Sequence, residues 1–181
     1  MNIVLIGMKG CGKTTVGKLL AHNLAVPFLD CDAEIEKICQ QEQGETLPFR
    51  QIFARYGAAY FHELEAQALR KIAQNSENAR FVLSCGGGTP LRQENQEILR
   101  KAGKIIFLDV EKEILLQRIL AHGIPAFFPY QDNPQKSLDV LLAARLPVYQ
   151  QCAGITLHVA GDAPEAIVAT ILKQVRENDA D

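Results

Sequence analysis

The sequence has little of what marks membrane proteins and nucleic-acid-binding proteins. No uncharged apolar run reaches the roughly 18 to 20 residues that a membrane-spanning helix needs, and the apolar run at residues 3–6 is too short for a signal-peptide core. The 19 Lys and Arg residues face 21 Asp and Glu residues, so the formal charge of -2 provides no overall attraction to a nucleic-acid backbone or an anionic membrane. We therefore expect a cytoplasmic chain without nucleic-acid or membrane partners, in which any bound anion is held locally.

The chain also lacks the cysteine and histidine spacings of disulfide frameworks and metal sites. Its five cysteines are odd in number and far apart, and no two of them form a C-x-x-C pair. This argues against both a disulfide framework and a structural zinc site. The four histidines are equally scattered. A divalent cation in this protein is therefore expected to be held by oxygen ligands and phosphate.

What the sequence does contain is the composition of one globular domain. Of its 181 residues, 48% are hydrophobic and 22% are charged, which provides enough apolar surface for a core and excludes disorder as the main state. Short apolar runs alternate with amphipathic stretches, as is typical of a parallel sheet covered by helices on both faces. The expected strands are residues 3–6, 28–29, 81–83, 105–108 and 156–159.

Helices are expected between these strands because apolar residues recur there at helical spacing. Two further helices are predicted to open at Thr89-Pro90, where Thr can cap, and at Asp162, where a capping-box pattern begins. Three prolines interrupt residues 123–134, which are predicted to form a mobile loop inside one domain of residues 1–181. The other expected helices are residues 14–24, 58–73, 111–121 and 138–151.

The strongest motif is Gly-Met-Lys-Gly-Cys-Gly-Lys-Thr at residues 7–14, which matches G-x-x-x-x-G-K-[ST] throughout. An apolar strand precedes it and an amphipathic helix follows it, which is the context of a phosphate-binding loop. Backbone N–H groups would bind phosphate, Lys13 would reach the outer phosphates and Thr14 would be a Mg²⁺ ligand. Cys11, beside Lys13 and a helix N-terminus, is expected to be a reactive thiol that bound phosphates cover. The alternative is a flexible glycine turn.

A phosphate-binding loop does not identify the reaction. The chain has no N-K-x-D segment of the kind that GTPases use to read guanine. Asp109 ends an apolar strand, as an acidic residue does in ATPases that drive motors, but Val110 follows it where those proteins have Glu. A structural role is therefore favoured for Asp109, and the class that remains is a small kinase.

Three further segments are predicted to form the acceptor site of such a kinase. Asp30 and Asp32 end the second strand. There Asp30 would approach Mg²⁺, and Asp32 would approach a substrate hydroxyl. The alternative is that they cap the N-terminus of a helix over residues 33–41. The triple glycine at residues 86–88 ends the third strand and either admits a ligand close to backbone amides or forms a plain tight turn. Arg145 places a cation near the end of a helix, where its alternative role is to complement the helix dipole.

With these motifs together, the chain resembles the shikimate kinase family nearly from end to end. The similarity lies in G-x-x-x-x-G-K-T-T-V-G-K, F-x-D-x-D-x-x-I-E, I-F-x-x-x-G-x-x-x-F, the triple glycine and R-x-P-x-Y. The resemblance implies a three-layer α/β/α P-loop kinase domain with five parallel strands in order 2-3-1-4-5, substrate-binding helices over about residues 32–73 and a mobile lid over about 122–134. It also implies transfer of the γ-phosphoryl group of ATP, with Mg²⁺, to the 3-hydroxyl of shikimate in aromatic amino-acid biosynthesis.

The resemblance further implies roles for single residues, in a protein expected to be a monomer. Lys13 and Asp32 would be catalytic, with Asp32 orienting the acceptor hydroxyl and accepting its proton, and Thr14 and Asp30 would hold Mg²⁺. The residues that would bind ATP are Gly10, Cys11, Gly12, Lys13, Thr14, Thr15 and, near the adenine, Arg118. The residues that would bind shikimate are Asp32, His62, Gly86, Gly87, Gly88 and Arg145.

Two features depart from the family pattern. His62 stands where the family has an arginine that contacts the substrate carboxylate, and the lid lacks the arginine that reaches the transferring phosphate. Lys9 either faces the acceptor pocket in compensation or is a solvated loop charge, and His62 is either a pH-dependent donor or a helix-surface residue. Phe127 and Phe128 either exclude water under a closed lid or only pack. The alternative functions are therefore a kinase for another small hydroxyl acceptor and a nucleotide-binding paralogue with little catalysis.

Overall fold

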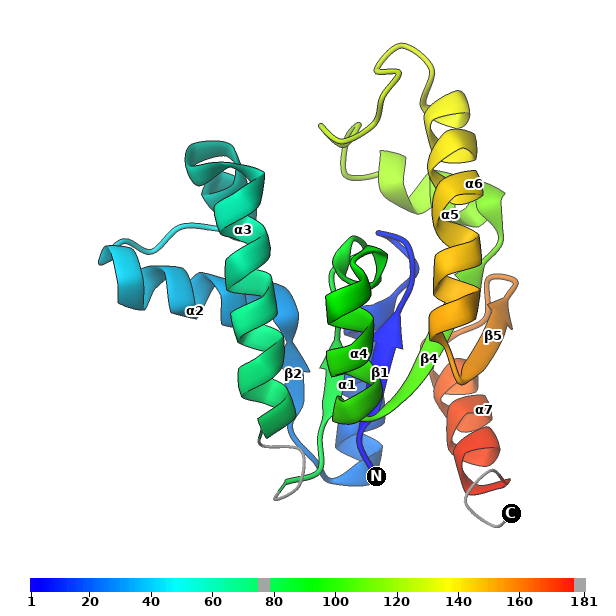
Figure 1. The fold of residues 1–181 in the computed structure, drawn as a ribbon. Coiled ribbons are helices and arrows are strands. Elements are labelled where there is room, and N and C mark those ends of the chain that lie inside the picture. The colour runs from blue at the N-terminus through cyan, green and yellow to red at the C-terminus, as the bar shows by residue number, and fades with distance from the viewer. Residues whose placement is uncertain (75–78, 178–181) are drawn as a thin grey trace.

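One parallel sheet organises the structure, a computed structural model that describes residues 1–74 and 79–177. The strand order is β2-β3-β1-β4-β5, and every neighbouring pair is parallel (Figure 1). This confirms the expected strands, whose ends shift by one or two residues, and the order that the family resemblance implies. The strands are β1 (Ile3–Ile6), β2 (Phe28–Asp30), β3 (Val82–Ser84), β4 (Lys104–Val110) and β5 (Ile155–Val159).

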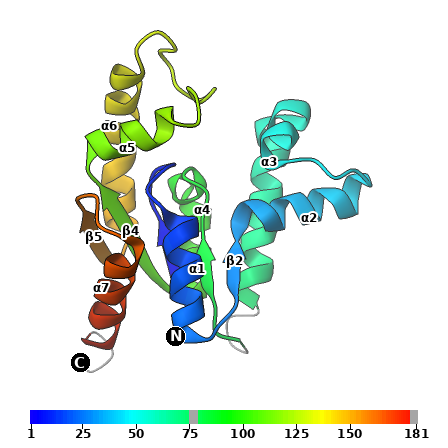
Figure 2. The same cartoon turned by 180° about the vertical axis from the view of Figure 1, so that it is seen from behind.

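Helices cover both faces of the sheet. Figures 1 and 2 show α1 and α7 on one face and α4 and α6 on the other, while α2 and α3 extend beyond the edge formed by β2. All four residues of β1 are buried because this central strand is covered on both sides. Within the described ranges, every helix is too short or too polar to span a membrane. The helices are α1 (Lys13–Leu24), α2 (Cys31–Gln43), α3 (Phe49–Gln74), α4 (Gln93–Ala102), α5 (Lys112–Leu120), α6 (Pro134–Cys152) and α7 (Pro164–Glu177).

Two expected helix starts are corrected. α2 begins at Cys31, because the carboxylate of Asp30 accepts a hydrogen bond from the N–H of Asp32 at 3.0 Å and is the N-cap. Asp32 therefore lies in the first helical turn and is not the cap. At Thr89 the chain makes only a 3₁₀ turn, Thr89–Leu91, and the α-helix starts later, at Gln93.

A glycine separates the acceptor-side helix into two parts. α3 carries a non-helical residue at Gly57, with φ 82° and ψ 174°, so a new helical segment starts where the sequence predicts one, at residue 58. The expected irregular loop lies between α5 and α6. It is shorter than predicted, because α6 begins at Pro134 and not at residue 138, with the proline in the first turn of the helix. Pro147 lies inside α6.

Candidate active site

The predicted site segments lie at one edge of the sheet. The phosphate loop follows β1, Asp30 and Asp32 lie at the end of β2, and the triple glycine at residues 86–88 follows β3. Because these strands are parallel neighbours, their carboxyl ends meet at the same edge, where α/β proteins bind ligands. Segments about 25 and 80 residues from the phosphate loop in sequence therefore surround one region.

The phosphate loop is tightly curled around the ammonium group of Lys13. Gly12 adopts φ 94° as the N-cap of α1, a conformation that favours glycine. The Nζ atom of Lys13 donates to the carbonyls of Gly7 at 2.9 Å and Met8 at 3.0 Å, so the side chain folds back over its own loop. Thr14 and Thr15 are exposed in the first turn of α1. A positive charge, a helix N-terminus and two hydroxyls thus surround the place where phosphates would bind.

Arg118 lies on α5 beside the same loop. If Gly12 carried a Cβ atom, that atom would lie 3.9 Å from Nη1 of Arg118. A Cβ atom on Gly10 would lie 3.8 Å from the Cβ atom of Arg118. The structure therefore brings Arg118 next to the predicted nucleotide site. Its contact with adenine stays a prediction.

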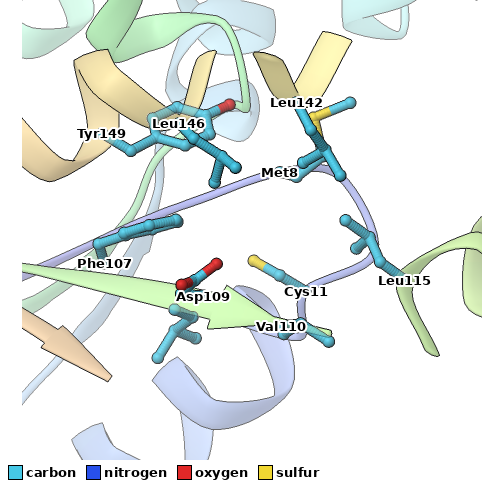
Figure 3. Close-up of a pocket in the computed structure, with 10 residues that line it drawn as sticks. Met8, Cys11, Phe107, Asp109, Val110, Leu115, Leu142, Leu146 and Tyr149 are labelled. Atoms are coloured by element: carbon cyan, nitrogen blue, oxygen red, sulfur yellow. The ribbon is translucent and has the colours of Figure 1, made fainter. Parts of the chain in front are cut away.

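The expectation of an accessible Cys11 thiol is wrong. Cys11 is only 1% exposed, and Figure 3 shows its sulfur pointing under the loop toward Phe107 and Asp109. The thiol lines a cavity of about 10 Å³, room for at most about one water molecule. The curl of the loop turns this side chain into the core, so only the backbone of Cys11 is left to meet phosphates.

The carboxyl group of Asp32 faces the triple glycine. Its Oδ1 atom is 3.1 Å from where a Cβ on Gly86 would lie, so a side chain at Gly86 would crowd the carboxylate. Burial, and then the negative charge of Asp30, raise the pKa of Asp32 to about 6, against the opposing positive charge of Lys13. A carboxyl group with this pKa is a base at neutral pH and is stronger than an ordinary aspartate.

Asp30 and Thr14 offer only oxygen atoms. Asp30 uses Oδ1 to cap α2, and the Thr14 hydroxyl is exposed at the start of α1. Residues 1–74 and 79–177 contain no cluster of three His, Cys, Asp or Glu side chains that could enclose a metal ion. A donor set of one carboxylate and one hydroxyl suits Mg²⁺, which keeps water and substrate phosphates among its ligands.

A buried carboxylate supports the triple-glycine turn from the α3 side. Glu65, 4% exposed, accepts hydrogen bonds from the Thr89 hydroxyl at 2.7 Å and from the Asn95 amide at 2.9 Å. His62 lies one helical turn before Glu65, with its Nδ1 atom 4.0 Å from the Glu65 carboxylate. The His62 side chain is 37% exposed on α3, so both interpretations of this residue stay predictions. Its predicted contact with substrate remains untested.

A buried phenol supports the same turn from the α6 side. The Tyr149 hydroxyl donates a hydrogen bond of 2.6 Å to the carbonyl of Gly87. Sequence reasoning gave no role to Glu65 or to Tyr149. The signal for Glu65 was an acidic residue between Leu64 and Ala66 on a core-facing helix, and Tyr149 ends the R-x-P-x-Y motif.

Arg145 lies inside α6 and not at its end, so the helix-dipole role is excluded. Its Nη1 atom lies 3.4 Å from the sulfur of Met8. A Cβ atom on Gly87 would lie 3.8 Å from the same Nη1 atom. Phe127 stands over both Arg145 and Lys9, with its ring centroid 5.6 Å from the guanidinium carbon and 5.7 Å from the Lys9 Nζ atom. The structure thus brings Arg145 to the predicted acceptor site.

The two lid phenylalanines have different environments. Phe128 is 2% exposed and packs in the core, as the simpler interpretation holds, whereas Phe127 is 43% exposed and covers the two cations. Asp109 pairs with His158 of the neighbouring strand at 2.9 Å. This contact agrees with the structural role predicted for Asp109.

Comparison with known proteins agrees with the geometry. A family model described as shikimate kinase matches residues 9–176. A shikimate kinase from Enterococcus faecalis is 37% identical over 177 residues, which cover 97% of this chain and 99% of the relative. A shikimate kinase from Symbiobacterium thermophilum is 36% identical over 179 residues, covering 98% and 97%. The solved structure of Acinetobacter baumannii shikimate kinase in complex with shikimate superposes with a TM-score of 0.84 at 32% identity, covering 99% of this chain and 95% of the other.

Proposed function

The chain belongs to the shikimate kinase family, and from that premise we propose that its site transfers the γ-phosphoryl group of ATP to the 3-hydroxyl of shikimate, with Mg²⁺ as cofactor. The observation that carries the proposal is the position of Asp32. Its carboxylate adjoins Gly86 of the acceptor-side turn and is influenced by the charge of Lys13 from the phosphate loop. A single base therefore lies between the two halves of the site.

The chemistry follows from this placement. Asp32 accepts the proton of the acceptor hydroxyl as the hydroxyl oxygen bonds to the γ-phosphorus, and the bond from that phosphorus to the β–γ bridging oxygen breaks, so ADP leaves. Lys13 and the N–H groups of the loop stabilise the charge on the phosphates during transfer. Thr14 and Asp30 would hold Mg²⁺, which neutralises phosphate charge when it is bound.

The remaining binding roles are proposed for the residues that line the region. Gly10, Cys11, Gly12 and Thr15 would bind ATP phosphates through the loop, and Arg118 would lie near the adenine. Arg145, on the acceptor side, would bind the shikimate carboxylate with the fork of its guanidinium group. The other acceptor-side residues with proposed contacts are His62, Gly86, Gly87 and Gly88.

We also propose that the enzyme is a cytoplasmic monomer. All five cysteines are free and buried, which suits a reducing compartment. Residues 32–73 would form the substrate-binding region and residues 122–134 a moving lid, within one domain of residues 1–181. Light scattering after size-exclusion chromatography tests the oligomeric state, and a dimer mass would contradict the proposal.

A coupled assay of ADP release tests the function, with shikimate and a panel of other small hydroxy acids and polyols as acceptors. We expect ADP release that depends on shikimate, and a product whose phosphorus NMR spectrum shows a phosphate monoester at the 3-oxygen. Efficient turnover of a different acceptor would indicate a kinase of altered specificity, as the replacement at His62 permits. Nucleotide binding without turnover of any acceptor would indicate a paralogue with little catalysis.

A further inference from the structure

We propose that Lys9 and Arg145 form a two-cation clamp for the carboxylate of the acceptor, with Lys9 supplying the second positive charge. This inference rests on the proposed function, because it names how the same site recognises an acidic acceptor. Lys9 belongs to the phosphate loop by sequence. Its backbone nitrogen nevertheless adjoins Gly87 of the acceptor-side turn, and its ammonium group lies over the ring of Phe127 from the lid.

The geometry of Gly87 brings the two residues together. A Cβ atom on Gly87 would lie 3.4 Å from the backbone nitrogen of Lys9 and 3.8 Å from Nη1 of Arg145. Both cationic groups also reach the ring of Phe127, at 5.7 Å and 5.6 Å from its centroid. Lys9 and Arg145 therefore flank one glycine and share one aromatic cover.

Neither Lys9 nor Arg145 forms an ion pair within 4.0 Å with any carboxylate in residues 1–74 and 79–177. Burial, and then the positive charge of Arg50 on α3, lower the pKa of Lys9. The positive charges of Lys9 and Arg145 repel each other, and a carboxylate bound between them would relieve that repulsion.

His62 is poorly placed to be that second cation. Its Nδ1 atom lies 4.0 Å from the buried carboxylate of Glu65, so a protonated His62 would be attracted toward Glu65. Lys9 has no such competing carboxylate within ion-pair distance in the described chain. Arg50, which influences Lys9, lies in the first turn of the acceptor-side helix α3. The cationic end of Lys9 thus belongs to the acceptor half of the site.

The test compares two variants with two acceptors. Lys9→Met removes the charge and Lys9→Arg keeps it, while shikimate and its methyl ester share the reacting 3-hydroxyl and differ in the carboxylate charge. We expect Lys9→Met to raise KM for shikimate about tenfold or more, since a hydrogen bond between charged groups is lost. The KM for ATP should stay within about twofold. The effect should shrink to about twofold for the ester, and Lys9→Arg should recover most of the affinity for shikimate.

A matched control removes one positive charge elsewhere. Lys101 is exposed in the last turn of α4, so Lys101→Met should leave both Michaelis constants unchanged. Thermal unfolding checks that each variant is folded, and Lys9→Gln replaces Lys9→Met if the latter does not fold. Equal effects of Lys9→Met on shikimate and on the ester would overturn the clamp, as would no effect. A raised KM for ATP would instead assign Lys9 to the nucleotide.

Calorimetric titration with shikimate separates this inference from the proposed function. A wild-type protein that binds shikimate without transferring phosphate would contradict the proposed function. The clamp would still be supported if Lys9→Met weakens that binding about tenfold and the ester binds both proteins equally weakly. Wild-type protein that does not bind shikimate at all would overturn the clamp.

Discussion

The hydroxyl of Tyr149 donates a hydrogen bond of 2.6 Å to the carbonyl of Gly87, and so joins α6 to the acceptor-side turn after β3. Tyr149 is fully buried and its ring packs 5.1 Å from that of Phe107. Burial raises the pKa of Tyr149 to about 12, against the opposing charge of Arg145. The phenol therefore stays protonated at neutral pH and remains a donor to Gly87.

Replacing this phenol should weaken both the fold and acceptor binding. Tyr149→Phe leaves the carbonyl of Gly87 without its partner, which should cost about 1 to 2 kcal/mol in the free energy of unfolding. We expect KM for shikimate to rise about threefold to tenfold, because the Gly87 backbone is less firmly held. Urea denaturation and steady-state kinetics measure the two effects. Tyr130→Phe is the control, because Tyr130 is exposed in the lid, and an equal change there would argue against a specific role for Tyr149.

The raised pKa of Asp32 predicts that stability depends on pH. The folded protein holds the proton with a pKa of about 6, above the ordinary value of 3.8, so folding favours protonated Asp32. The stability that protonated Asp32 adds to the folded state is fully present below about pH 4 and is lost as the pH rises through about 6. Without ligands, Asp32→Asn should therefore be more stable than wild type at pH 8, by on the order of 2 kcal/mol, and should match it near pH 4. Chemical denaturation at several pH values measures the difference. A constant difference across that range would contradict the pKa shift.

Nucleotide binding should depend on Lys13. A ligand that binds only the folded state raises the unfolding temperature by mass action. We expect millimolar Mg-ATP to raise the unfolding temperature of wild type and Lys13→Ala to lose most of this rise, because its ammonium group lies over the phosphate loop. Lys18→Ala is the control, since Lys18 is exposed one turn further along α1. An unchanged unfolding temperature of wild type with Mg-ATP would count against a nucleotide site.

The burial of Cys11 predicts slow thiol chemistry. All five cysteines are buried, and Cys11 is 1% exposed beneath the loop. Alkylation of the native protein should therefore be slow at Cys11 whether or not ATP is present, whereas all five thiols should react in denaturant. Mass spectrometry of labelled peptides measures each site. Rapid labelling of Cys11 that ATP suppresses would show that the loop opens.

The sequence was sufficient to predict what depends on local pattern. The apolar runs and the G-x-x-x-x-G-K-T motif predicted the strands and the loop, because backbone preferences and hydrophobic spacing act over a few residues. The direction of the Cys11 side chain was not predictable in this way, since it depends on how the loop curls over Phe107. The links from Tyr149 to Gly87 and from Glu65 to Thr89 were also missed. They join residues 62 and 24 positions apart, and only the folded sheet brings them together.

The arginine that the family has at position 62 should restore function where the clamp is broken. In the Lys9→Met protein we expect His62→Arg to recover about tenfold in KM for shikimate, because a guanidinium group adds a permanent charge that can pair with a carboxylate in a fork. In wild type the same change should improve KM by only about twofold, since Lys9 already supplies the second charge. Steady-state kinetics of the four proteins gives the coupling between the two positions. If His62→Arg improved KM equally in both backgrounds, Lys9 and residue 62 would act independently and would not share the carboxylate. If it improved neither while another acceptor was turned over well, the pocket would be built for that acceptor, and the kinase fold would remain.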